Sequence, residues 1–177
     1  NNYNESLYTN NKNVYGLLRY GVKVKADVGE NYETVALIDW KHPLKNQFAI
    51  AEEVTVQGNH DKRPDMVLYV NGIALGVLEL KRSTVSIGDG IRQGIVNQQK
   101  EFIQSFFSTM QFVFAGNDTE GLRYGTIGTP EKYFLKWKEA GGEEKLLDKY
   151  LLKLCDKERF LEIIYNFTLF DGGMKKL

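Results

Sequence analysis

The segment that most constrains the fold of this chain is residues 63–81, which read RPDMVLYVNGIALGVLELK. Its two halves are apolar and meet at Asn71-Gly72, a pair that tolerates the positive φ angles of a tight turn. The sequence therefore predicts a β-hairpin. Because both faces of each strand are apolar, we expect the hairpin to lie inside a sheet that is covered on both sides.

Three charged side chains stand at the open end of this hairpin. Asp65 precedes the first strand, and Glu79 and Lys81 end the second. Ionised groups in a buried strand cost several kcal/mol unless they are paired or bind a metal. Glu79 and Lys81 are two residues apart, so they project from the same face, about 7 Å apart along the strand. The pattern indicates a polar site, with a salt-bridged cluster at a sheet edge as the alternative.

The register of the hairpin decides whether Asp65 joins this site. With a two-residue turn and an unbroken ladder, Asp65 would face Leu78 and point away from Glu79. A three-residue loop with Gly72 in the left-handed conformation, or a β-bulge elsewhere in the hairpin, would shift the register by one residue. We predict such a shift, because a shared site requires it.

The order Pro64-Asp65, followed by Glu79-Leu80-Lys81, resembles the PD-(D/E)xK nuclease signature. The likeness extends over residues 17–22, 35–40, 43–48 and 63–82, which together resemble the N-terminal part of the restriction (R) subunit of type I restriction-modification enzymes. This resemblance implies an α/β fold with a restriction-endonuclease-like mixed β-sheet core, flanking helices and a C-terminal helical tail.

The resemblance also implies a function, which is Mg²⁺-dependent hydrolysis of double-stranded DNA after ATP-driven translocation by the full complex. Asp65, Glu79 and the carbonyl of Leu80 would bind Mg²⁺, which prefers oxygen ligands and keeps several waters. Lys81 would orient or help to activate the attacking water and offset phosphate charge. ATP would bind to motor domains of the full-length subunit, and no P-loop pattern occurs in this chain. The implied partners are DNA and the methyltransferase (M) and specificity (S) subunits.

The helix expected after the hairpin matches the family pattern only in part. The resemblance implies a Gln-x-x-x-Tyr motif that helps to shape the site. Gln93 matches its first position, whereas Asn97 stands in place of the Tyr. The two would share one helix face at i, i+4. Gln93 is thus a candidate catalytic residue, or else a solvated helix residue. Glu5 is a candidate further metal ligand, or else a surface residue.

The charge balance and the cysteine content limit which functions and features the chain can have. Lys+Arg and Asp+Glu balance at 23 each, so no overall basic field indicates nucleic-acid binding. A DNA contact would be a local patch, with Lys62, Arg63, Lys81, Arg82 and Arg92 as its candidates. Cys155 is the one cysteine, which excludes an internal disulfide. No signal peptide or membrane span is visible, so we expect a cytoplasmic protein without membrane association.

The other elements follow from periodicity and capping residues. Helices are expected at 14–20, after Ser86 or Asp89, from Thr129-Pro130-Glu131, and within 143–167 with a restart near Asp156. Strands are expected at 22–26, 34–40, 48–57, 111–115 and 122–127. We predict a nuclease domain at 1–140 and a helical linker at 141–177 towards motor domains, with Gly172-Gly173 as linker. The chain begins without Met, which suggests a piece of something longer.

Two other functions stay open. In the first, the chain is a nuclease-fold module whose metal site serves structure or coupling to a partner. In the second, it is a nucleic-acid-binding domain of a repair factor, without catalysis. The DNA affinity of a binding domain would survive loss of Glu79, because Lys and Arg contacts to phosphate supply it. We prefer the nuclease, because an acidic cluster repels DNA unless a cation intervenes.

Overall fold

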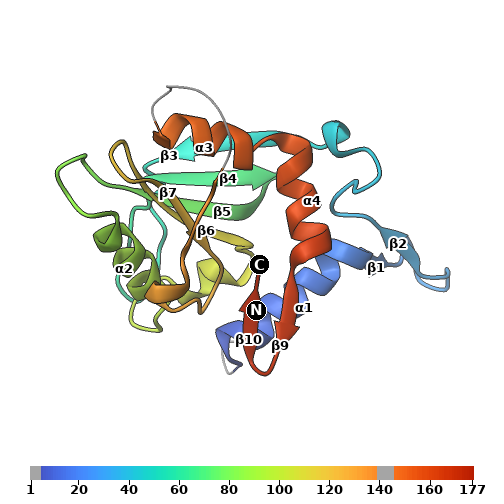
Figure 1. The fold of residues 1–177 in the computed structure, drawn as a ribbon. Coiled ribbons are helices and arrows are strands. Elements are labelled where there is room, and N and C mark those ends of the chain that lie inside the picture. The colour runs from blue at the N-terminus through green and yellow to red at the C-terminus, as the bar shows by residue number, and fades with distance from the viewer. Residues whose placement is uncertain (1–4, 139–145) are drawn as a thin grey trace.

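The computed structural model describes residues 5–138 and 146–177. Its centre is a six-stranded sheet in the order β3-β4-β5-β6-β7-β8 (Figure 1). The parallel pair is β5 with β6, and the other neighbours are antiparallel. The predicted mixed α/β fold class is confirmed. The strands are β3 (Phe48–Glu52), β4 (Met66–Val70), β5 (Ile73–Leu80), β6 (Phe112–Asn117), β7 (Gly121–Gly125) and β8 (Leu135–Lys136).

Helices bury both faces of the sheet, as the apolar hairpin predicts. One face packs beneath α2 (Ile87–Asn97), and its core includes Val77 and Val113. The other face packs against α3 (Leu146–Leu154), α4 (Lys157–Phe167) and part of α1 (Leu7–Tyr20), with Leu78 and Phe114 in that core. Successive residues of β5 thus serve opposite cores, because side chains alternate along a strand. None of the helices in the described ranges is long and apolar enough to cross a membrane.

Several helix ends lie where capping chemistry predicts them. Ser86 caps α2 by accepting from the backbone N–H of Gly88, and Asp156 caps α4 by accepting from Arg159. Gly21, at φ 82°, ends α1. Three short 3₁₀ helices complete the helical elements: η1 (Pro43–Lys45), η2 (Gln104–Ser108) and η3 (Glu131–Tyr133).

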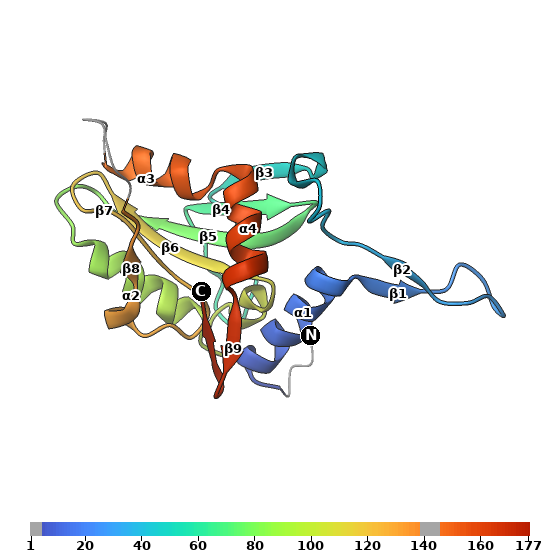
Figure 2. The same ribbon diagram turned by 45° about the vertical axis from the view of Figure 1, so that its right-hand side comes forward.

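Several predicted elements differ from the structure, and the strand expected at 48–57 ends at Glu52. The expected helix from Thr129 is only the single turn η3, because the Thr129 hydroxyl accepts from the backbone N–H of Thr126 and closes a turn that leads into β8. The strand expected at 34–40 ends early. Here β1 (Val22–Val24) and β2 (Glu33–Val35) pair with each other and form an arm that reaches away from the sheet (Figure 2).

The C-terminal segment packs onto the sheet. Helices α3 and α4 form as predicted, and Leu154 and Ile164 lie fully buried in the same core as Phe114. The expectation that Gly172-Gly173 is linker is wrong. Both glycines have positive φ and form the turn of a hairpin between β9 (Leu169–Asp171) and β10 (Met174–Lys176). The predicted domain boundary at residues 140 and 141 lies outside the described residues, and a link to motor domains stays a prediction.

Candidate active site

The central hairpin contains the predicted register shift. Asn71 and Gly72 form a two-residue turn with φ 50° and 77°, so the three-residue loop does not occur. The register instead shifts between Leu68 and Tyr69, where β5 contributes one extra residue, Leu75. This is the second of the two predicted ways to shift the register, a β-bulge elsewhere in the hairpin. It shifts the pairing of the residues beyond it by one position.

The bulge brings two carboxylates to one face of the sheet. Beyond it, Met66 pairs with Leu78, so the next residues outward, Asp65 and Glu79, stand opposite each other. Glu79 shares its face with Val77, which lies in the core beneath α2. Glu79 is only 1% exposed. Burial, and after it the charge of Asp65, raises the pKa of Glu79 to about 7.

Main-chain hydrogen bonds hold Asp65 at the open end of the hairpin. The backbone N–H of Leu80 donates to Asp65 Oδ2 over 2.6 Å, and the backbone N–H of Glu53 donates to the Asp65 carbonyl over 2.9 Å. In an extended strand the N–H and C=O of one residue point the same way. The Leu80 carbonyl therefore points towards Asp65, whereas Lys81 donates to Gly116 on the opposite side. Asp65, Glu79 and Leu80 thus lie together at the open end of the hairpin.

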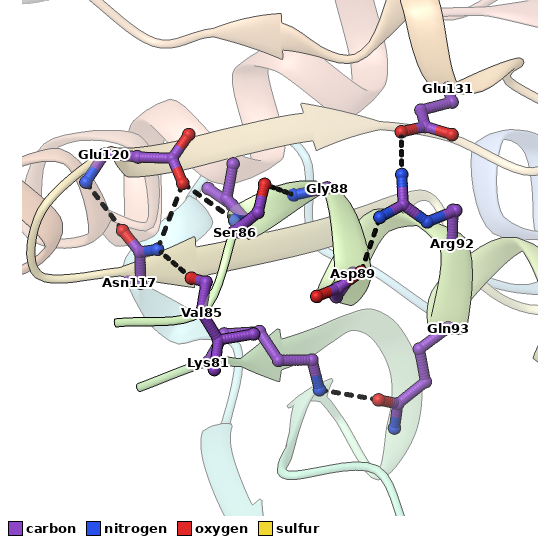
Figure 3. A network of polar contacts seen from close by, with 11 residues as sticks. Lys81, Val85, Ser86, Gly88, Asp89, Arg92, Gln93, Asn117, Glu120 and Glu131 are labelled. Carbon is purple, nitrogen blue, oxygen red and sulfur yellow. Dashed lines mark hydrogen bonds and ion pairs between the residues drawn. The ribbon is translucent and has the colours of Figure 1, made fainter. Parts of the chain in front are cut away.

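Lys81 and Gln93 join this site through a continuous chain of contacts. Lys81 Nζ donates to Gln93 Oε1 over 2.6 Å (Figure 3). Gln93 Nε2 donates to Glu79 Oε2 over 2.7 Å. The structure therefore places the four candidate catalytic residues, Asp65, Glu79, Lys81 and Gln93, together on the α2 side of the sheet.

Two further residues contribute to the site beyond the four candidate catalytic residues. Asn97 Nδ2 donates to Glu79 Oε1 over 3.2 Å, and Asn97 is 2% exposed. Its position four residues after Gln93 had placed it on the same helix face, where a polar role towards the site was open. The positive charges of Lys81 and, to a smaller extent, Lys62 oppose the rise in the pKa of Glu79. Sequence reasoning placed Lys62 in a basic patch without linking it to Glu79.

Only part of the expected basic patch carries uncompensated charge towards the site. Arg92 forms ion pairs with Asp89 and Glu131 (Figure 3), and Arg63 contacts Glu53 at 3.4 Å. These arginines are exposed and neutralised by neighbours. Lys62 and Lys81 are the cations whose charge acts on Glu79.

The pair of carboxylates is not extended by a third acidic or imidazole ligand. In residues 5–138 and 146–177, no group of three or more His, Cys, Asp or Glu side chains is placed to hold a metal ion. Glu5 instead lines a small surface pocket with Asn59 and Lys100. Protein sites for Mg²⁺ often supply only one or two carboxylates, with water and phosphate completing the shell. The donor set of Asp65, Glu79 and the Leu80 carbonyl fits that ion.

Comparison with known proteins places the chain in a family. Residues 1–132 match the family model described as Type I restriction enzyme R protein N terminus. The chain belongs to this family.

Relatives from three organisms support this placement. The chain is 31% identical over 164 residues to a Methanocaldococcus jannaschii protein named provisionally as the type I restriction enzyme MjaVIIIP endonuclease subunit, covering 86% of this chain and 15% of that protein. It is 24% identical over 153 residues to the EcoprrI endonuclease subunit of Escherichia coli, covering 82% and 49%. It is 27% identical over 179 residues to the HindI endonuclease subunit of Haemophilus influenzae, covering 93% and 17%. The chain thus spans from 15% to 49% of the length of these relatives.

Proposed function

We propose that this chain is a Mg²⁺-dependent nuclease module that hydrolyses phosphodiester bonds of double-stranded DNA for a type I restriction enzyme. One observation supports this most. The β-bulge in the hairpin sets Asp65 opposite Glu79, whereas an unbroken ladder would place them on opposite faces. A shift that brings two negative charges together has a clear use if a divalent cation binds between them.

The electrostatics of the two carboxylates support a bound cation. Glu79 is buried, and the repulsion from Asp65 disfavours its ionised form. A carboxylate offers about four acceptor positions, and each oxygen of Glu79 accepts a single amide hydrogen bond from α2. These two neutral amides do not offset the charge of the two carboxylates, which a divalent cation would. Mg²⁺, when bound, would polarise the scissile phosphate and lower the pKa of a coordinated water.

The two lysines supply the remaining functions of the site. Lys81 is held by Gln93 beside Glu79, so its ammonium would orient the attacking water and offset charge on the phosphate. Lys62 adds a second positive charge near the carboxylates. Gln93 contacts both Lys81 and Glu79, which keeps these two side chains in a fixed arrangement.

The activity of the whole enzyme is a further part of this proposal, because the chain spans only part of its relatives. ATP-driven translocation would belong to motor domains outside this chain. The M and S subunits would provide modification and sequence recognition in a cytoplasmic complex. The alternative is a non-catalytic nuclease-fold module for DNA binding or coupling, whose binding would not depend on Glu79.

Calorimetric titration with Mn²⁺ tests the metal site directly. We expect the wild-type chain to bind Mn²⁺, and Asp65→Asn and Glu79→Gln each to weaken binding by more than about 100-fold, because each removes a charged ligand. Asp171→Asn is the matched control, since Asp171 is an exposed carboxylate that pairs with Lys176. Equal heats in all four proteins would refute the site.

A cleavage assay with the complete enzyme then separates catalysis from coupling. Plasmid DNA would be incubated with the assembled enzyme, ATP and Mg²⁺, using R subunits that carry the same substitutions. We expect Asp65→Asn and Glu79→Gln to abolish cleavage while ATP hydrolysis continues. If Asp65→Asn and Glu79→Gln still cleaved DNA, the result would favour the alternative, in which this module is non-catalytic.

A further inference from the structure

We propose that Asn97 is a positioning residue that fixes the Glu79 carboxylate for metal binding. This inference rests on the metal site proposed above. Asn97 lies at the last position of α2, and its amide donates to Glu79 Oε1 over 3.2 Å. It is 2% exposed, so this hydrogen bond forms away from solvent. When one partner of a buried hydrogen bond is removed, the other partner stays buried without a hydrogen bond, which is unfavourable.

The two amides of α2 hold both oxygens of one carboxylate. Gln93 Nε2 contacts Oε2, and Asn97 Nδ2 contacts Oε1. Rotation of the Glu79 carboxylate about its terminal torsion would break at least one of these bonds. The Glu79 carboxylate is therefore kept in one orientation. Residues that orient a metal ligand in this way contribute to metal affinity without touching the ion.

Asn97 makes a different contribution from Gln93. Gln93 Oε1 also accepts from Lys81, so the position of Gln93 depends on a flexible lysine at the rim of the site. Asn97 contacts Glu79 from the buried end of the helix, and its backbone carbonyl accepts from the N–H of Ile103 over 3.3 Å. Asn97 is buried whereas Gln93 is exposed, so Asn97 is the amide donor that is shielded from solvent.

The close approach of α2 to the sheet lets so short a side chain reach Glu79. Gly90 and Gly94 lie on the same helix face as Asn97, at i, i+4 and i+7. A Cβ on Gly90 would lie 3.2 Å from Ala115 Cβ, and one on Gly94 would lie 3.1 Å from Val113 Cγ1. Larger residues at these positions would therefore move the helix outward. The two glycines allow the close helix packing that brings the Asn97 amide to the Glu79 carboxylate.

A matched residue elsewhere separates this role from an ordinary structural one. Asn46 is also buried, at 8% exposure, and its side chain forms hydrogen bonds with Asp39 and Pro43. It lies beside the closed end of the hairpin, where its Oδ1 accepts from Asn71. Loss of Asn46 therefore removes part-buried hydrogen bonds without touching Glu79.

The test measures Mn²⁺ affinity by calorimetry in wild type, Asn97→Ala, Asn46→Ala and Glu79→Gln, alongside urea unfolding of each metal-free protein. We expect Asn97→Ala to bind Mn²⁺ about 10-fold more weakly and to alter the electron paramagnetic resonance spectrum of the bound ion. Asn46→Ala should lose at least as much stability and bind Mn²⁺ as wild type does. Should Asn97→Ala fail to fold, Asn97→Leu removes the donor while keeping a side chain of similar size.

The outcomes distinguish the two proposals. Unchanged affinity and spectrum in Asn97→Ala would overturn the positioning role while leaving the metal site intact. Equal losses of affinity in Asn97→Ala and Asn46→Ala would also overturn it, because a general loss of packing would then explain both. Absence of binding in wild type, as in Glu79→Gln, would overturn the metal site and the role of Asn97 with it.

Discussion

Glu79 in the candidate active site and Lys175 in the C-terminal hairpin are both charged residues in the interior, at 1% and 4% exposure. Their surroundings differ in kind. Lys175 Nζ donates to Asn11 Oδ1 at 2.9 Å, to Gln111 Oε1 at 2.6 Å and to the Met110 carbonyl at 3.3 Å. The Lys175 amine thus has three oxygen partners, all supplied by the protein.

Glu79 lies opposite a group of its own sign. Each of its oxygens accepts one amide hydrogen bond, and the charge that raises its pKa most is that of another carboxylate, Asp65. The comparison teaches that burial of a charge does not by itself indicate a functional site. Lys175 joins the C-terminal hairpin to α1 and to the residues just before β6, whereas Glu79 lies opposite a like charge. A second carboxylate beside a buried one is the feature that distinguishes the site.

The largest expected effect is on stability at Lys175. Lys175→Ala should lower the free energy of unfolding by about 3 kcal/mol, because it leaves a cavity and deprives Asn11 and Gln111 of a partner. Lys176→Ala is the neighbouring control. Lys176 is exposed and pairs with Asp171, so its loss should cost about 0.5 kcal/mol. Urea unfolding measures both, and a small effect at Lys175 would contradict its structural role.

Glu79 should show the opposite behaviour, because its pKa is raised from 4.5 to about 7 on folding. The folded protein then binds the proton more tightly than the unfolded chain, so the metal-free protein should lose about 3 kcal/mol of stability as the pH rises from about 4.5 to 7. Glu79→Gln should remove this loss and be the more stable protein at pH 8, by about 2 kcal/mol.

The measurement is urea unfolding in EDTA between pH 5 and pH 8. Burial lowers the pKa of Lys175, which changes stability in the opposite sense, so only the difference between wild type and Glu79→Gln isolates Glu79. Destabilisation of Glu79→Gln at pH 8 would mean that this carboxylate serves the fold, as Lys175 does.

A smaller effect is expected from Gly94→Ala. The added methyl group would meet Val113 Cγ1 at 3.1 Å and move α2 outward, which draws its amide donors away from Glu79. We expect Mn²⁺ affinity to fall about fivefold, at the lower edge of effects from residues that orient ligands. Gly16→Ala is the control, since a Cβ there meets nothing within 4 Å. Equal affinity in the two variants would show that close helix packing is not needed.

The smallest effect should follow Arg92→Ala. Arg92 is exposed and pairs with Asp89 and Glu131, and exposed ion pairs contribute little. Stability should change by about 0.5 kcal/mol, and Mn²⁺ affinity should remain that of wild type. A large loss of metal affinity would show that the surface charges of α2 contribute to the site as much as its buried amides do.

Local sequence chemistry predicted much of the fold. The Asn71-Gly72 turn, the apolar strands beside it and the capping residue Asp156 depend on neighbours in the chain, and each occurs as expected. The C-terminal hairpin was missed because it contains only two three-residue strands, and its stability depends on the distant partners of Lys175.

The chemical identities of the candidate site residues were also determined by the sequence, from Asp65 and Glu79 to Lys81. Their meeting was decided by tertiary structure. Side chains alternate strictly along a strand, so the sequence could require a register shift but could not locate it at Leu68 and Tyr69. The place of a bulge depends on how both cores pack around the hairpin. Likewise, only the approach of α2 to the sheet brought Asn97 within reach of Glu79, because that distance is set by contacts between segments far apart in the chain.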